Sequence, residues 1–296
     1  MKKLLLAISI CAAAFAYAQD NGAAAANTGA AATQQAVAAQ PQETPAESLA
    51  DLKLGSKVLD KFSASVTVGY ESEYVFRGIR NAGDSVNPQV DLGYDFGAGF
   101  ATYIGYWGNY EVAGSANKME ESDLYAGITY TIKNITFDVG VINYIYPEAN
   151  SDEWEWKAAV SYDTTDLLGD FNVCPSFAYF YNNKYNVNTF EAGLSYSAPV
   201  MKWINGDNWL TIDSSVVYGF ICREGYNSQA GDYSYFQVKS DVVVSITNYC
   251  SWSLGIRYSL ASSNSQYWSY EGVGGYNGID ECGSYLWFGT AISFGF

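Results

Sequence analysis

Residues 135–146 read ITFDVGVINYIY, and the character of their side chains changes at every second position. Ile135, Phe137, Val139 and Val141 are apolar, whereas Thr136, Asp138 and Gly140 between them are small or polar. A period of two places the two sets on opposite faces of an extended strand. Residues 153–163 and 209–220 repeat the pattern. These stretches therefore predict β-structure with one apolar and one polar face.

The same texture continues from Phe62 to Phe296 and divides into twelve expected strands. These cover 63–79, 87–96, 99–110, 122–132, 135–147, 153–163, 171–183, 187–198, 209–222, 233–246, 250–261 and 283–296. Tight turns are expected at 97–98, 133–134 and 247–248, and long polar loops at 111–121, 223–232 and 262–282. Short turns at one end and long loops at the other are typical of outer-membrane barrels. The expected fold is all-β, a transmembrane antiparallel up-and-down β-barrel of about 12 strands.

A secreted β-sandwich would show the same alternation with the apolar face turned inward. Strands of ten or more residues favour the barrel, because they exceed the usual length in soluble sheets and fit a tilted membrane span. Tyr and Trp also gather at strand ends, as in an aromatic girdle. The last expected strand places Phe288, Ile292, Phe294 and Phe296 on one face. We expect the terminal Phe296 to be a signal for the outer-membrane assembly machinery, and outer-membrane lipid to surround the barrel.

The first 61 residues differ from the rest of the chain. Lys2 and Lys3, an apolar run over 4–15 and Ala16-Tyr17-Ala18 predict a signal peptide over 1–18. Residues 19–61 predict a disordered, low-complexity periplasmic leader, because they carry too little apolar surface to fold alone. Within it, 46–60 is compatible with either a short helix or a loose linker. The expected domains are therefore 1–18, 19–61 and the barrel at 62–296, in the outer membrane of a Gram-negative bacterium.

Composition narrows the function classes. The net charge of −16 opposes binding to the phosphates of nucleic acid. The sequence has no His, which removes the commonest general base and the commonest transition-metal ligand. We expect no enzymatic activity, catalytic residue, cofactor or metal centre. The widely spaced cysteines favour a disulfide between Cys222 and Cys282 at the long-loop rim over a metal cage, with free thiols as the alternative.

Three further segments resemble the TorF-type porin family of Gram-negative bacteria. SVTVGYESEYVFRGI (65–79) contains Tyr74, Phe76, Arg77, Gly78 and Ile79 of a characteristic block. NPQVDLGYDFGAGFATYIGYWGN (87–109) ends in Trp-Gly-Asn, and DLYAGITY (123–130) precedes FDVGVINYIYPEA (137–149). The resemblance covers 62–163. It implies an outer-membrane channel of unassigned substrate.

In a barrel, the polar face of each strand lines the lumen. The acidic candidates are Glu71, Glu73, Asp91, Asp95, Asp123, Asp138, Glu153, Glu155, Asp163, Glu191, Asp213 and Asp241, and the basic ones are Arg77, Lys157, Lys239 and Arg257. Rings of one charge select ions of the opposite charge, so this excess of acids predicts passive diffusion of small solutes or ions with a preference for cations. The first alternative is a structural barrel plugged by interior ion pairs. The second, behind it, is a barrel enzyme, which without His would have to use a carboxylate cluster. Arg77 beside Glu73 is expected to be either a constriction charge or a structural pair.

Overall fold

The computed structural model describes residues 60–112, 118–147, 150–169, 173–203, 208–223, 232–262 and 283–295. The expected signal peptide, the expected leader as far as residue 59, Cys282 and Phe296 lie outside the described residues.

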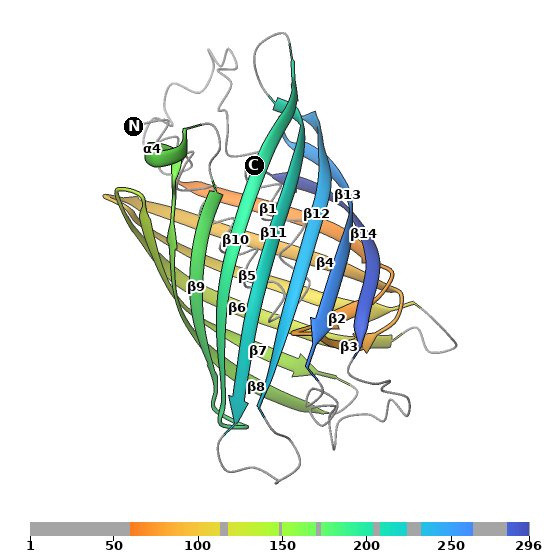
Figure 1. Ribbon diagram of the computed structural model, residues 1–296. Helices are drawn as coiled ribbons and strands as arrows, with labels where there is room; N and C mark the ends of the chain where they lie inside the picture. The colour runs from red at the N-terminus through yellow and green to blue at the C-terminus, as the bar shows by residue number, and fades with distance from the viewer. Residues whose placement is uncertain are drawn as a thin grey trace, which may run out of the picture.

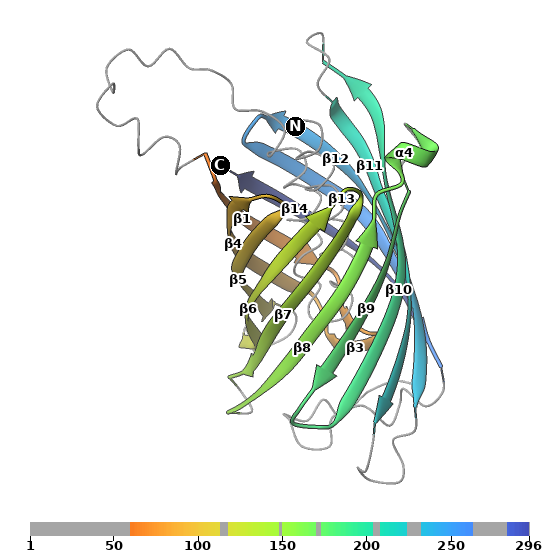
Figure 2. The same ribbon diagram turned by 90° about the vertical axis from the view of Figure 1, so that its left-hand side faces the viewer.

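Twelve antiparallel strands form one closed barrel, as the sequence predicts (Figures 1 and 2). They are β1 (Phe62–Glu71), β4 (Ser85–Gly97), β5 (Phe100–Glu111), β6 (Lys118–Ile132), β7 (Ile135–Tyr146), β8 (Ser151–Tyr162), β9 (Val173–Asn182), β10 (Val187–Lys202), β11 (Asn208–Arg223), β12 (Tyr233–Thr247), β13 (Cys250–Ala261) and β14 (Ser284–Gly295). Each strand pairs with its neighbour in the chain, and β1 pairs with β14 from Ser65↔Gly295 to Glu71↔Gly289. Closure leaves no wall strand with an unpaired edge.

The two faces of the wall carry the side chains that the alternation assigns to them. Val139 and Ile104 on the outer face are 61% and 56% exposed, whereas Asp138 on the inner face is 7% exposed. Most of the buried charged residues in the described strands point inward, and the large exposed hydrophobic residues point outward. In a soluble protein the apolar side chains point inward and the charged ones outward, so the two faces are reversed here.

The two ends of the barrel differ. The β4–β5 and β6–β7 turns and the one-turn helix α4 (Thr165–Leu168) lie at the upper end in Figure 1. We call this the short-turn end and the opposite one the long-loop end. The structure describes no helix that is long and apolar enough to cross a membrane.

One expectation about the strands is wrong. The first strand does not run from 63 to 79, because β1 ends at Glu71. The chain then forms a separate two-stranded sheet from β2 (Tyr74–Phe76) and β3 (Ile79–Ala82) at the long-loop end (Figure 1). The two turn residues between them, Arg77 and Gly78, have φ of 46° and 82°. Positive φ at both central positions is typical of a type I′ turn, the tightest hairpin connection. Residues 72–84 are called the inner hairpin below.

Candidate functional site: a hairpin across the lumen

The inner hairpin reaches from one wall of the barrel to the opposite wall. It leaves the wall between β1 and β4, and the contacts of Arg77 at its tip lie on β8, β9 and β10. In the strand order β9 and β10 are five steps from β4 and from β1, respectively, which is halfway round the ring. The hairpin therefore divides the lumen at this level.

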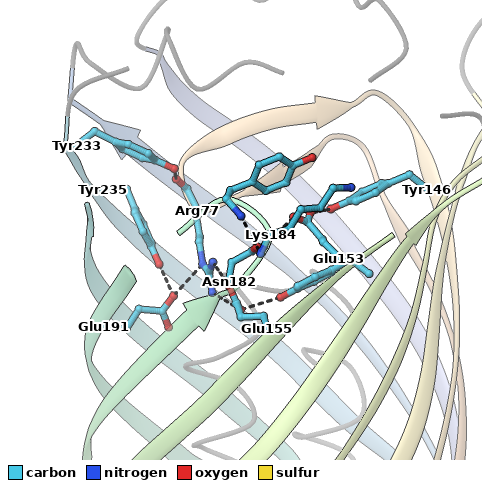
Figure 3. Close-up of polar contacts among 11 residues, drawn as sticks. Arg77, Tyr146, Glu153, Glu155, Asn182, Lys184, Glu191, Tyr233 and Tyr235 are labelled. Atoms are coloured by element: carbon cyan, nitrogen blue, oxygen red, sulfur yellow. Dashed lines mark hydrogen bonds and ion pairs between the residues drawn. The ribbon is translucent and has the colours of Figure 1, made fainter. Parts of the chain in front are cut away.

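Arg77 fixes the tip to the far wall by a fork of charge-assisted hydrogen bonds (Figure 3). Its Nη1 and Nη2 each donate to one carboxylate oxygen of Glu155 at 2.8 Å, and its Nε lies 3.6 Å from Glu191 Oε1. The guanidinium carbon lies 4.8 Å from the ring centroid of Phe180. Arg77 is only 5% exposed. A bidentate pair of this kind fixes orientation as well as position.

Tyrosines complete this contact. Tyr144 donates its hydroxyl proton to Glu155 at 3.0 Å, Tyr235 donates to Glu191, and Tyr233 donates to the backbone oxygen of Arg77 at 3.1 Å. The expected neighbour of Arg77 was Glu73, and the structure corrects this. Glu73 pairs instead with Arg80 on the hairpin, where both side chains are partly exposed.

The two sides of the hairpin differ in chemistry. Towards β10–β13, Ile79 packs against a buried apolar cluster of Val187, Val217, Ile221, Tyr233, Tyr235 and Ala261. Towards β5–β8, Tyr74 faces polar and acidic residues. Its ring centroid lies 5.5 Å from that of Trp107, and its hydroxyl donates to Glu121 Oε2 at 2.6 Å. The β10–β13 side is thus packed by apolar side chains, whereas the β5–β8 side combines apolar side chains with buried carboxylates.

The β5–β8 side contains a group that we call the acidic pocket, made of Asn109, Glu121, Asp123 and Glu153. Asp123 is 1% exposed, and neither of its carboxylate oxygens has a hydrogen-bond partner. Glu121 and Glu153 are both close enough to repel it electrostatically. Glu153 accepts hydrogen bonds from Asn182 Nδ2 at 2.7 Å and from the Tyr146 hydroxyl at 2.8 Å (Figure 3).

The other predicted lumen residues lie in separate groups along the inner wall. Arg257 bridges Glu71 at 3.1 Å and Asp241 at 2.7 Å, and Lys239 lies 3.0 Å from Asp241. Lys157 pairs with Asp138 at 2.6 Å. All four predicted lumen bases are therefore in ion pairs.

The remaining acids have neutral partners. Asp91 accepts from Ser65, Gln89 and Tyr125, and Asp213 accepts from Ser197. Asp95 and Asp163 each accept from a backbone N–H group at the short-turn end, from Gly97 and Thr165 respectively.

Sequence reasoning missed Glu121 and Asn109. Glu121 fell in the long loop expected at 111–121, and Asn109, although it lies in the expected strand 99–110, is uncharged and did not enter the count of acids and bases. In the structure β6 begins earlier, at Lys118. Asn109 pairs with Glu121 but Tyr110 pairs with Met119, so Glu120 is the extra residue of a β-bulge. Bulges re-aim side chains and are frequent beside functional sites. The available signal was parity: Glu121 shares the parity of Asp123, so an expected strand that began one residue earlier would have placed it on the inner face.

The predicted Cys222–Cys282 disulfide stays a prediction, since Cys222 lies near the end of β11 and Cys282 lies outside the described residues. The assembly role of Phe296 is likewise untested.

Solved structures with this architecture are outer-membrane barrels. An outer-membrane channel from Pseudomonas putida F1 has a TM-score of 0.50 at 9% identity, over 80% of this chain and 95% of that one. The NanC porin has a TM-score of 0.44 at 13% identity, over 78% and 98%. LpxR from Salmonella typhimurium has 0.45 at 10% identity, over 78% and 99%. At these identities the likeness concerns the fold alone.

No curated protein matches the chain. The resemblance to the TorF-type porins stays a prediction. The family model that matches is that of Gcw_chp, described as a bacterial protein of unknown function, and it covers residues 58–271. The chain therefore belongs to the Gcw_chp family.

Proposed function

We propose that this protein is a channel of the bacterial outer membrane that lets small ions and solutes diffuse passively and prefers cations. The observation that carries the proposal is the closed twelve-strand wall, apolar outside and polar inside, with a hairpin that spans its lumen. Twelve strands exceed the eight of barrels filled by side chains and fall short of the 16 to 18 of wide porins. A narrow passage fits this size.

The cation preference rests on where charge is left uncompensated. The four lumen bases are matched by acids in ion pairs, so the surplus negative charge gathers elsewhere. Glu121 and Asp123 form no ion pair with any described residue. Carboxylates in a lumen with low-dielectric walls attract cations and repel anions.

The inner hairpin supports a constriction. Its apolar side packs against the β10–β13 cluster through Ile79, which favours passage of ions on the other side, past the acidic pocket. The same contacts also favour the second candidate, a barrel that the hairpin closes and that has a structural role. Conductance distinguishes the two.

The test compares the protein with a variant that lacks the hairpin, in planar bilayers under a potassium chloride gradient. Glu71 and Ser85 are paired across β1 and β4, so an Asn-Gly turn can replace residues 72–84 without disturbing the register. We expect a small, cation-selective current from the native chain, and a current several-fold larger and less selective from the variant. Selectivity should fade between about 0.1 M and about 1 M salt, as the screening length falls from about 10 Å to about 3 Å.

Other outcomes would contradict the proposal. Anion selectivity of the native chain would show that the paired bases control the passage. Absence of current from the native chain, with current from the hairpin-free variant, would support the closed structural barrel. Absence of current from both would end the channel proposal.

A further inference from the structure

The acidic pocket combines negative charge with a lack of counter-charge. Asp123 interacts electrostatically with Glu121, Glu153 and Glu155, all of the same sign. The base of the inner hairpin, Arg77, donates from both of its Nη atoms to Glu155. Two buried carboxylates, Glu121 and Asp123, thus share a small space without a cation from the described chain.

A second observation concerns neutral groups at the same place. Asn109 is fully buried, and neither its amide nitrogen nor its amide oxygen has a hydrogen-bond partner. In the register, Asn109 lies opposite Glu121 and Trp107 opposite Asp123. Buried polar groups are normally hydrogen-bonded, so an unpartnered amide beside unpartnered carboxylate oxygens points to a ligand-binding site.

The donor set suggests what the occupant is. It offers two carboxylates, the amide oxygen of Asn109 and the hydroxyl of Tyr74, which are all oxygen atoms. Hard cations prefer oxygen, and Ca²⁺ tolerates irregular sets of carboxylate, amide and other oxygens better than Mg²⁺, which demands an octahedron. Among the described residues no three acids converge to hold a metal. The site would therefore use two carboxylates, whose charge of −2 balances one divalent ion.

The local structure is suited to holding such an ion. Glu121 and Asp123 lie two residues apart on the inner face of β6, and the β-bulge at Glu120 directly precedes them. Tyr74 of the inner hairpin covers Glu121 from the lumen side through its 2.6 Å hydrogen bond. Hairpin and wall together enclose the carboxylates.

We propose that Asn109, Glu121 and Asp123 form a binding site for a divalent cation of the Ca²⁺ class, enclosed by Tyr74 of the inner hairpin. The inference rests on the proposed function in one respect, since it names the cation that the β5–β8 side of the lumen retains. The hairpin and the ion then depend on each other. The ion removes the repulsion between Glu121 and Asp123, and Tyr74 of the hairpin encloses the ion through its bond to Glu121.

The test is calorimetric titration of Ca²⁺ into the whole protein in detergent. We expect one site in the native chain and at least a tenfold loss of affinity in Asp123→Asn, which keeps the shape and removes one charge. Asp152→Asn is the matched control, because Asp152 is an exposed aspartate on β8. It should leave the affinity unchanged. Heat-modifiable mobility on a gel verifies that each variant is folded.

A second measurement uses Tb³⁺, which replaces Ca²⁺ and emits when a nearby indole is excited. Sensitised emission should appear in the native chain, be displaced by Ca²⁺ and disappear in Trp107→Phe, although that variant keeps its Ca²⁺ affinity. Asn109→Leu should lower the affinity several-fold, because it removes an oxygen ligand.

Three results would overturn the site: no binding of Ca²⁺ by the native chain, equal affinity in Asp123→Asn, or an equal loss in Asp152→Asn. If the native chain binds no Ca²⁺, Glu121 and Asp123 do not form a metal site. Neither titration depends on conduction. Current without Ca²⁺ binding would refute the site and leave the channel, whereas binding without current would refute the channel and leave the site.

Discussion

Arg77 concentrates the attachment of the inner hairpin in one side chain. It neutralises Glu155, lies close to Glu191, and accepts through its backbone oxygen the hydroxyl proton of Tyr233. Arginine suits this position because its planar fork matches a carboxylate, which the single ammonium group of lysine does not. In the sequence Arg77 is one of four basic candidates among twelve acidic ones. Only the structure shows that its side chain contacts the wall opposite the strand from which the hairpin leaves.

We expect Arg77→Met to lower the free energy of unfolding by about 3–5 kcal/mol, because it leaves two buried carboxylates without their counter-ion. The free energy of unfolding of Arg77→Lys should lie between that of the native chain and that of Arg77→Met. The measurement is urea unfolding in detergent, followed by gel mobility. Arg80→Met is the control: its pair with Glu73 is partly exposed, so its loss should cost about 1 kcal/mol or less. Equal losses in Arg77→Met and Arg80→Met would show that the fork does not hold the hairpin.

At the scale of elements, the sequence predicted the barrel strands and missed the hairpin. A period of two persists over each wall strand, and eleven predicted strands end within four residues of the observed bounds. The hairpin escaped because Tyr74, Phe76 and Arg77 continue the alternation of β1. Over 74–79 only Val75 and Ile79, which are apolar at the polar parity, depart from it. Its turn is Arg-Gly, which has the glycine of a type I′ turn but not the usual Asn or Asp before it. The contacts that keep it inside the barrel come from strands far along the chain.

The turn of the hairpin gives an element-scale prediction. A Cβ on Gly78 would stand 2.8 Å from Cβ atoms of both Ala261 and Tyr235, at a φ that disfavours side chains. Gly78→Ala should therefore unseat the tip and raise single-channel conductance towards that of the hairpin-free variant. Gly97→Ala is the matched control, since Gly97 has φ of 85° with nothing within 4 Å. It should cost about 1–2 kcal/mol of stability and leave conductance unchanged. Unaltered conductance in Gly78→Ala would refute the constriction.

At the scale of the molecule, the wall is a single sheet closed on itself, and its outer face is apolar over its length. Large exposed apolar surfaces mark contact with lipid or with other proteins. The sequence predicted this inversion of inside and outside from strand length and the position of its aromatic residues. The filling of the lumen could not be predicted, because alternation reports which face a residue occupies and says nothing about its partner.

The whole-molecule prediction is that the purified protein requires detergent and migrates faster on a gel when unheated than after boiling. The reason is that the closed hydrogen-bonded wall resists denaturation until heat opens it, while its outer face needs an apolar environment. A monodisperse monomer in detergent-free buffer would contradict the membrane location.

The seam between β1 and β14 has a consequence for how the protein is made. Thr67 and Ser293 share a 2.8 Å hydrogen bond across the seam although 226 residues separate them. Contacts of such long range form late, because the loop-closure entropy has to be overcome first. Until the last strand arrives, β1 is an open edge, and the hairpin that follows it lacks Tyr233, its partner 156 residues downstream. An unpaired edge is a template for aggregation. The nascent sheet must therefore be sheltered along its first strand for almost the whole time that the barrel takes to assemble.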